Sequence, residues 1–152
     1  AIVEAVRGPE VRLTLSAEKQ LVELDEKGQD KISWESLEGK VTVQPGDVLR
    51  YTVDGANSGE VEAEGLSITQ PVPEQTTYFL KSAQSDSSAE TVYSIDGGQS
   101  FVAEPMVEVP LPDGTVELQP APAEMYTHVQ WNFGDDLASA QAVKATYNVQ
   151  VQ

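Results

Sequence analysis

Apolar and polar residues alternate along much of the chain, and this alternation is the main structural signal in the sequence. In residues 49–53, 127–133 and 143–151, most apolar side chains occupy every second position. A period of two is typical of strands with one buried face. We therefore predict strands in these three stretches, with Trp131 on the face that points into the core.

Turn-forming residues separate the alternating stretches. Pro45-Gly46-Asp47 is expected to form a tight turn, because proline presets φ for the second turn position and glycine accepts the positive φ that follows. Asp96-Gly97-Gly98 and Asp113-Gly114 indicate the turns of two further strand pairs. The expected strands around them are 91–95 with 99–102, and 106–109 with 115–118. Towards the N-terminus we predict strands at 10–15, 20–24 and 32–34, with a turn or bulge at 16–19.

Helical spacing of apolar residues is missing from the sequence, and we expect at most a turn or two of helix near 135–142. Roughly eight to ten short strands, with turn residues about every ten positions, predict an all-β fold. The expected architecture is an immunoglobulin-like antiparallel β-sandwich. With 152 residues the chain has the usual length of one domain, so residues 1–152 are assigned to a single domain.

Two motifs resemble a known family. The first is the Pro45-Gly46-Asp47 turn, followed by a strand with an aromatic residue and a threonine and by an Asn57-Ser58-Gly59 corner. The second spans 66–78, where a strand ends in proline and a short turn leads to a threonine and an aromatic residue. Both resemble the DUF11 or conserved-repeat domain of bacterial surface proteins, although Glu74 and Gln75 stand where that family more usually has small residues and glycine. The resemblance implies an exported domain, in the periplasm, on the cell surface or secreted.

The charge of the chain is strongly negative and unevenly distributed. The formal net charge is -16, and residues 1–50 carry seven Lys or Arg and ten Asp or Glu, whereas 51–152 carry two and fifteen. Such a surface repels phosphate backbones and anionic lipids, so we expect no nucleic-acid partner. No apolar run approaches the about 20 residues that span a bilayer, so direct membrane insertion is not expected either. A cationic partner and a divalent ion both remain compatible with this charge.

The sequence contains no cysteine, which excludes disulfides and thiolate chemistry but does not fix the cellular compartment. The chain begins Ala1-Ile2-Val3, as would follow removal of a signal peptide or other trimming of the N-terminus. This start agrees with export without establishing it.

Catalytic motifs are not evident. His128 is the one histidine, and it alternates with Val129 and Trp131, so we predict that it faces outward. No Gly-x-Ser-x-Gly nucleophile motif and no glycine-rich nucleotide loop accompany it. We therefore expect no enzymatic activity and no catalytic residue, with a carboxylate-dependent hydrolase as the weaker alternative.

Aromatic residues mostly fall on the apolar faces of the predicted strands. Trp34, Trp131, Tyr51, Tyr93 and Tyr147 are therefore expected to lie mainly in the core. Tyr126 and Phe79 are the better candidates for a surface site, because they lie opposite their apolar neighbours.

Calcium is the one cofactor that the sequence leaves open. Calcium prefers clustered oxygen ligands, and a sandwich gathers its loops at two ends. The candidate ligands are Asp25, Asp30, Asp86, Asp96, Asp113, Asp135 and Asp136. None of them lies in an EF-hand loop, and turn chemistry already accounts for Asp96 and Asp113.

These observations favour a non-catalytic exported module with a structural or interaction role, whose partner is a protein or another envelope component. The alternative is a soluble ligand-binding or calcium-binding domain. Strand addition along an unpaired sheet edge is one way in which such a module binds a partner.

Overall fold

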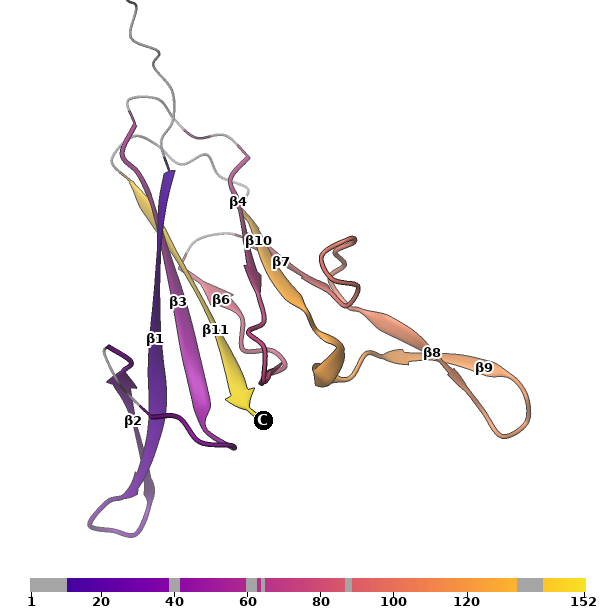
Figure 1. Cartoon of the computed structure of the whole chain (residues 1–152), viewed down its shortest axis with the longest axis horizontal. Coiled ribbons are helices and arrows are strands. Elements are labelled where there is room, and N and C mark those ends of the chain that lie inside the picture. The colour runs from indigo at the N-terminus through magenta and orange to yellow at the C-terminus, as the bar shows by residue number, and fades with distance from the viewer. Residues whose placement is uncertain (1–10, 39–41, 60–62, 64, 87–88, 134–140) are drawn as a thin grey trace, which may run out of the picture.

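The computed structural model describes residues 11–38, 42–59, 63, 65–86, 89–133 and 141–152. Eleven strands lie in this part of the chain, and their pairings are antiparallel. Two sheets face each other as the layers of a β-sandwich, and a third, two-stranded sheet projects from them (Figure 1). The predicted all-β sandwich is confirmed, with more strands than the roughly eight to ten expected from the turn spacing.

The larger sheet has the strand order β2-β1-β3-β11-β5, and β6 also pairs with β11. Leu49 lies opposite Val149 and Val53 opposite Ala145, so the odd-numbered side chains of β3 and β11 share one buried face. This is the arrangement that the alternation predicts. The bounds are β1 Val11–Leu24, β2 Asp30–Ser36, β3 Val48–Asn57, β5 Thr76–Tyr78, β6 Gln84–Ser85 and β11 Ala142–Val151.

The smaller sheet consists of β4 (Ser67–Pro71), β10 (His128–Phe133) and β7 (Ala89–Ser94), in that order. Val129, Trp131 and Phe133 point from β10 into the core, and Trp131 is 0% exposed. The Tyr147 hydroxyl donates a hydrogen bond of 3.2 Å to the Pro71 carbonyl and so joins the two layers. The core also contains Leu49, Val53, Ile68, Tyr78, Val143, Ala145, Tyr147 and Val149.

β1 is one continuous strand, so the predicted turn or bulge at 16–19 is wrong. Its first part pairs with β3 and its last part with β2, and the two pairings overlap at Glu18 and Lys19. Beyond this point β1 and β2 project together as a hairpin (Figure 1).

The predicted hairpin at 91–102 forms only in part. Tyr93 and Val102 exchange two backbone hydrogen bonds, but they make a single bridge and not a ladder. The Asp96 carboxylate accepts hydrogen bonds from the hydroxyls of Ser94 and Ser100 and from the Ser100 N–H, which holds the intervening chain in a compact loop. The second predicted pair is confirmed as β8 Met106–Pro110 and β9 Val116–Pro120.

The turn before β3 closes as predicted. The Asp47 N–H donates to the Gln44 carbonyl at 3.0 Å, and Gly46 has a φ of 94°. The turn is also bonded to the last strand, β11, because the Gly46 N–H donates to the Val151 carbonyl and the Val151 N–H donates to the Asp47 carbonyl. In the described chain the one helical element is the 3-10 turn η1, Ala123–Met125; most of the possible helix near 135–142 falls outside the described residues.

Candidate functional site

The β8–β9 hairpin is an arm that projects from the sandwich (Figure 1). Its ladder runs from the pair Met106–Pro120 to the pair Pro110–Val116. Within the described residues neither strand pairs with a strand of another sheet. The arm therefore has two edges whose outward backbone groups are open to a further strand.

One face of the arm is mostly apolar, with Glu108, opposite Leu118, as its one charged residue. The register places Met106, Val116 and Leu118 on the same face, where they are 43%, 58% and 63% exposed. Pro110 and Pro120 extend this face along the ladder. An exposed and largely apolar surface on a projecting element is typical of a site for another molecule.

A cleft of about 380 Å³ lies where the arm joins the sandwich. Tyr78, Tyr93 and Tyr126 form its aromatic wall, with ring centroids 5.2 to 5.5 Å apart. Met106 and Pro120 line the cleft and also belong to the apolar face of the arm, so the two surfaces are continuous. Burial raises the pKa of both Tyr93 and Tyr126 above its ordinary value.

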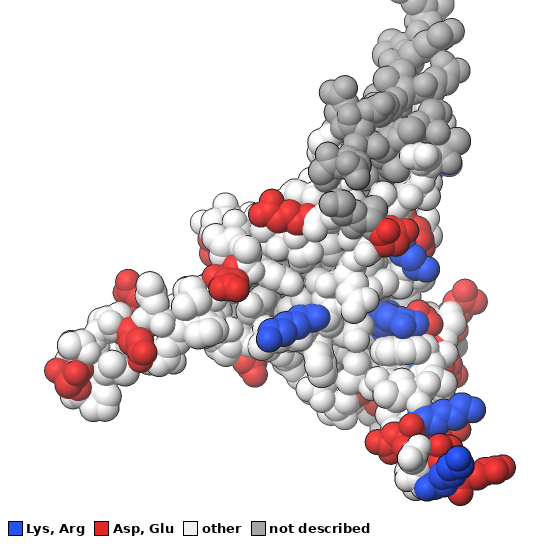
Figure 2. All heavy atoms as spheres, turned by 180° about the vertical axis from the view of Figure 1, so that it is seen from behind, with Lys and Arg blue, Asp and Glu red and all other residues white. Residues whose placement is uncertain are grey.

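The arm and its base are acidic. Between Lys81 and Lys144 the sequence contains no Lys or Arg, whereas Glu104, Glu108 and Glu117 lie on or beside the arm. Figure 2 shows the arm projecting to the left with acidic and uncharged residues and no basic one. Lys81, which lines the cleft, adopts a φ of 67° that non-glycine residues rarely hold.

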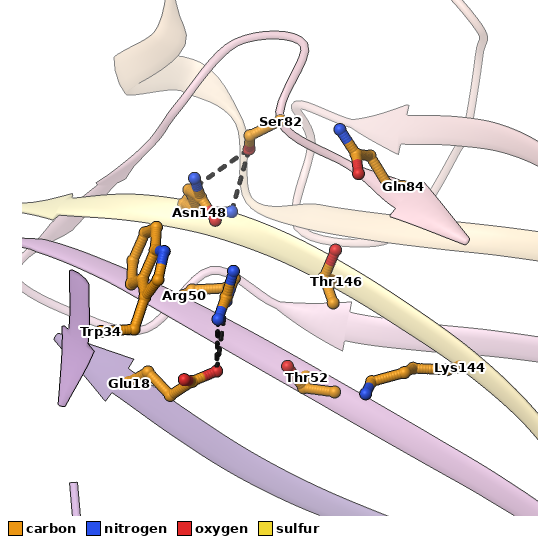
Figure 3. Close-up of a pocket in the computed structure, with 9 residues that line it drawn as sticks. All are labelled: Glu18, Trp34, Arg50, Thr52, Ser82, Gln84, Lys144, Thr146 and Asn148. Carbon is orange, nitrogen blue, oxygen red and sulfur yellow. Dashed lines mark hydrogen bonds and ion pairs between the residues drawn. The ribbon is translucent and has the colours of Figure 1, made fainter. Parts of the chain in front are cut away.

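A second concave site lies on the outer face of the larger sheet (Figure 3). This trough has a volume of about 390 Å³. Its floor comes from β3 and β11, Trp34 of β2 stands at one side, and Ser82 and Gln84 stand at the other. The residues that line the trough are Glu18, Trp34, Arg50, Thr52, Ser82, Gln84, Lys144, Thr146 and Asn148.

An ion pair orders one end of the trough. Arg50 donates to one oxygen of Glu18 from Nη2 at 2.8 Å and from Nε at 3.2 Å. The guanidinium carbon lies 4.2 Å from the centroid of the Trp34 ring, in cation–π geometry. Lys144 lies towards the other end, and within the described chain its ammonium group has no ion pair.

Sequence reasoning missed the trough because it assigned Trp34 to the core. Trp34 lies on the outer face of the larger sheet, opposite Gln20, and contacts Arg50. The pairing register explains the difference: Trp34 shares the face of Gln20, which points away from the smaller sheet. Trp131 and Tyr147 lie in the core as expected, and Tyr126 and Tyr93 meet in the cleft.

His128 lies on the face of β10 opposite Val129 and Trp131, as predicted, and is half-buried. Its Nδ1 lies 3.0 Å from the Thr127 hydroxyl, and its ring packs edge-on against Phe101. The pair with Thr127 holds the ring in place, and the Thr127 hydroxyl donates its proton to the Ser94 carbonyl at 3.1 Å.

The calcium candidates are dispersed over the described chain. Asp25 accepts hydrogen bonds from the N–H groups of its own turn, Asp86 accepts the Lys144 N–H, and Asp30 begins β2. Hydrogen bonds led by the Ser100 hydroxyl lower the pKa of Asp96 to about 2, and bonds from Thr115 lower the pKa of Asp113. No group of three or more His, Asp or Glu able to hold a metal ion occurs among the described residues. Asp135 and Asp136 lie outside them, and calcium binding stays a prediction.

Comparisons with protein-family models, with curated proteins and with solved structures found no match to this chain. The similarity to the DUF11 domain therefore stays a prediction from the motifs. The described residues form no helix of the length and apolarity that crossing a membrane requires.

Proposed function

We propose that this chain is a non-catalytic, exported interaction module that binds an extended segment of a partner protein through the β8–β9 arm. The observation that carries the proposal is the arm itself, which combines two open strand edges with an exposed apolar face. Strand addition would satisfy the outward backbone groups and cover the apolar side chains in one step.

The charge around the arm specifies the partner's chemistry. Glu108 lies on the mostly apolar face opposite Leu118, Glu117 lies on the other face of the arm, and Glu104 and Lys81 line the tyrosine cleft. A bound strand that alternates apolar and basic residues would place its apolar side chains on the arm's face and its basic ones near these carboxylates. An acidic segment, including the net-acidic β1–β2 hairpin of a second copy, would be repelled.

Titration with a synthetic peptide tests the proposal. The probe is a capped peptide that alternates valine and lysine, with one tyrosine, and the control probe replaces lysine with glutamate. We expect the valine–lysine peptide to shift the backbone amide resonances of β8 and β9, and to bind more weakly at high salt because screening reduces the charge attraction. The valine–glutamate peptide should not bind.

Matched variants locate the binding surface. Leu118→Lys should weaken peptide binding by at least about tenfold, because it places a cation on the apolar face that must be desolvated. Val22→Lys, at a similarly exposed apolar position on the β1–β2 hairpin, should leave binding unchanged. Equal losses in both variants, or no binding of the valine–lysine peptide, would contradict the proposed role of the arm.

Export is tested separately by fractionating cells that express the protein from its own reading frame. The proposal predicts recovery from the periplasm, the cell surface or the medium. Recovery from the cytoplasm would overturn the assignment to an exported module.

A further inference from the structure

We propose that the chain forms a two-fold dimer in which the free edge of β2 pairs antiparallel with β2 of a second copy. β2 is the outermost strand of the larger sheet, and within the described residues it pairs with β1 alone (Figure 1). The inference rests on the backbone and the side chains of β2. It goes beyond the peptide binding proposed for the β8–β9 arm, because the two surfaces belong to different hairpins.

The outward backbone groups of β2 are open to another strand. The Leu37 N–H donates to the Ala17 carbonyl, and the Asp25 N–H donates to the Gln29 carbonyl, so odd-numbered residues at both ends of β2 direct their backbone groups towards β1. This direction alternates along an antiparallel strand. The groups directed to the free edge are therefore those of Asp30, Ile32, Trp34 and Ser36. The strand contains no proline or glycine, and such an edge can pair with a further strand.

The side chains of β2 are complementary to themselves about Ser33. A two-fold axis through Ser33 places Lys31 opposite Glu35 of the second copy, and Ile32 opposite Trp34 of the second copy. Because Ser33 is the central residue of the strand, this register also pairs β2 over its full length. Moving the axis by one residue in either direction separates Lys31 from Glu35. Charge and overlap therefore favour the same register.

The charges next to this pair continue the same alternation. Within one chain Lys31 lies opposite Glu23, and Glu35 lies opposite Lys19. Across the joined sheets one row would consist of Glu23 and Lys31 of one copy, followed by Glu35 and Lys19 of the other. Each charge in the row then has only opposite charges as its neighbours, which stabilises cross-strand pairing.

The net charge opposes association, and the local pairs offset it. Residues 18–36 carry three Lys and six Asp or Glu, and Figure 2 shows both signs of charge on this hairpin, at the lower right. The remaining charge of β2, on Asp30, lies opposite the uncharged Ser36 of the second copy. At physiological salt the Debye length is about 8 Å, so directly opposed charges outweigh the repulsion between two chains of charge -16.

Apolar side chains on the other face of the hairpin add to the interface. Val22 lies opposite Ile32, and the two are 56% and 57% exposed. The proposed register places Trp34 of the second copy beside Ile32, so part of this apolar surface leaves the water. A single edge-to-edge pairing buries less than the about 1,200 Å² of a standard interface. We therefore expect a weak dimer, with a dissociation constant between about 10 µM and 1 mM.

Charge variants of β2 test the dimer by sedimentation velocity at physiological salt. Lys31→Glu and Glu35→Lys should each weaken self-association at least about tenfold, because like charges then face each other in both pairs. An equimolar mixture of the two variants should associate again, because each acidic strand faces a basic one. This recovery would also show that the hairpin folds in both variants. Lys81→Glu makes the same change in net charge away from β2 and should leave association unchanged.

Single cysteines test the register, since the chain has none of its own. In the proposed dimer the two Ser33 residues form a pair without mutual backbone hydrogen bonds, with Cα atoms about 4.5 Å apart, which is compatible with a disulfide. The two Ser36 residues lie roughly 20 Å apart. Both positions are exposed. Under mild oxidation Ser33→Cys should form a covalent dimer at least about ten times faster than Ser36→Cys.

The inference is overturned if the wild type stays monomeric up to about 1 mM, or if the mixed charge variants associate no better than each does alone. It is also overturned if Lys81→Glu weakens association as much as Lys31→Glu does, because net charge would then be the cause. Equal rates of disulfide formation at Ser33→Cys and Ser36→Cys would contradict the register. None of these results bears on peptide binding by the arm, which is measured at the amides of β8 and β9.

Discussion

At the scale of single residues, Trp131 shows how the core combines good packing with one unmet hydrogen bond. Its side chain is 0% exposed and its ring lies 5.9 Å from that of Tyr147, centroid to centroid. Its Nε1–H is buried and has no hydrogen-bond partner within the described chain. The apolar surface of the indole therefore stabilises the fold, while its N–H carries a desolvation penalty.

Substitutions of Trp131 separate these two effects. Trp131→Ala should lower the free energy of unfolding by about 3 to 5 kcal/mol, because it leaves a large cavity between the sheets. Trp131→Phe should cost less than about 2 kcal/mol, because removal of the unpaired N–H offsets part of the lost packing. Chemical denaturation of both variants measures this difference. Equal losses would show that the indole N–H is hydrogen-bonded in the folded protein.

At the scale of elements, the loop after β7 is organised by one carboxylate. Asp96 accepts hydrogen bonds from the hydroxyls of Ser100 and Ser94, and its pKa falls from 3.8 to about 2 as a result. Since the folded state holds the ionised form, this contribution to stability is present above pH 3.8 and is lost as the pH falls through about 2.

We therefore expect Asp96→Asn to lower the melting temperature at pH 7. Between about pH 4 and pH 2 the melting temperature of the variant should fall less than that of the wild type, because the variant has no Asp96 carboxylate to protonate. Thermal unfolding of the wild type and the variant across this range is the measurement. Glu74→Gln, which removes a surface carboxylate for which no hydrogen bond is resolved in the described chain, serves as the control. Parallel pH profiles for the wild type and Asp96→Asn would contradict the role of this loop carboxylate.

The elements also show what the sequence can and cannot predict. The alternation correctly assigns Trp131 and the odd-numbered residues of β3 and β11 to the core, because each strand has one face between the sheets. The same alternation cannot show which face of β2 points away from the other layer, so Trp34 was expected to be buried. Nor does a turn motif give the number of pairs in a hairpin: Asp96-Gly97-Gly98 makes a turn, yet only Tyr93 and Val102 pair across it. The trough depends on such cross-strand neighbours, which no local pattern reveals.

At the scale of the whole molecule, two hairpins project from one sandwich and differ in charge. The β1–β2 hairpin carries lysines among its acidic residues, whereas the β8–β9 arm carries none (Figure 2). The arm contributes little to the core, which lies between the two larger sheets. A two-stranded hairpin is marginally stable alone, which agrees with our proposal that a partner covers the arm.

Removal of the arm tests this account most directly. The Ala121 N–H already donates to the Pro105 carbonyl at 2.9 Å, so a short glycine–serine turn can replace 106–120 at this point. We predict that this variant unfolds cooperatively, with a loss of no more than about 2 kcal/mol, and no longer binds the valine–lysine peptide. A variant that fails to fold would show that the arm is part of the structural core. A folded variant that still binds the peptide with the wild-type affinity would show that the binding surface lies elsewhere.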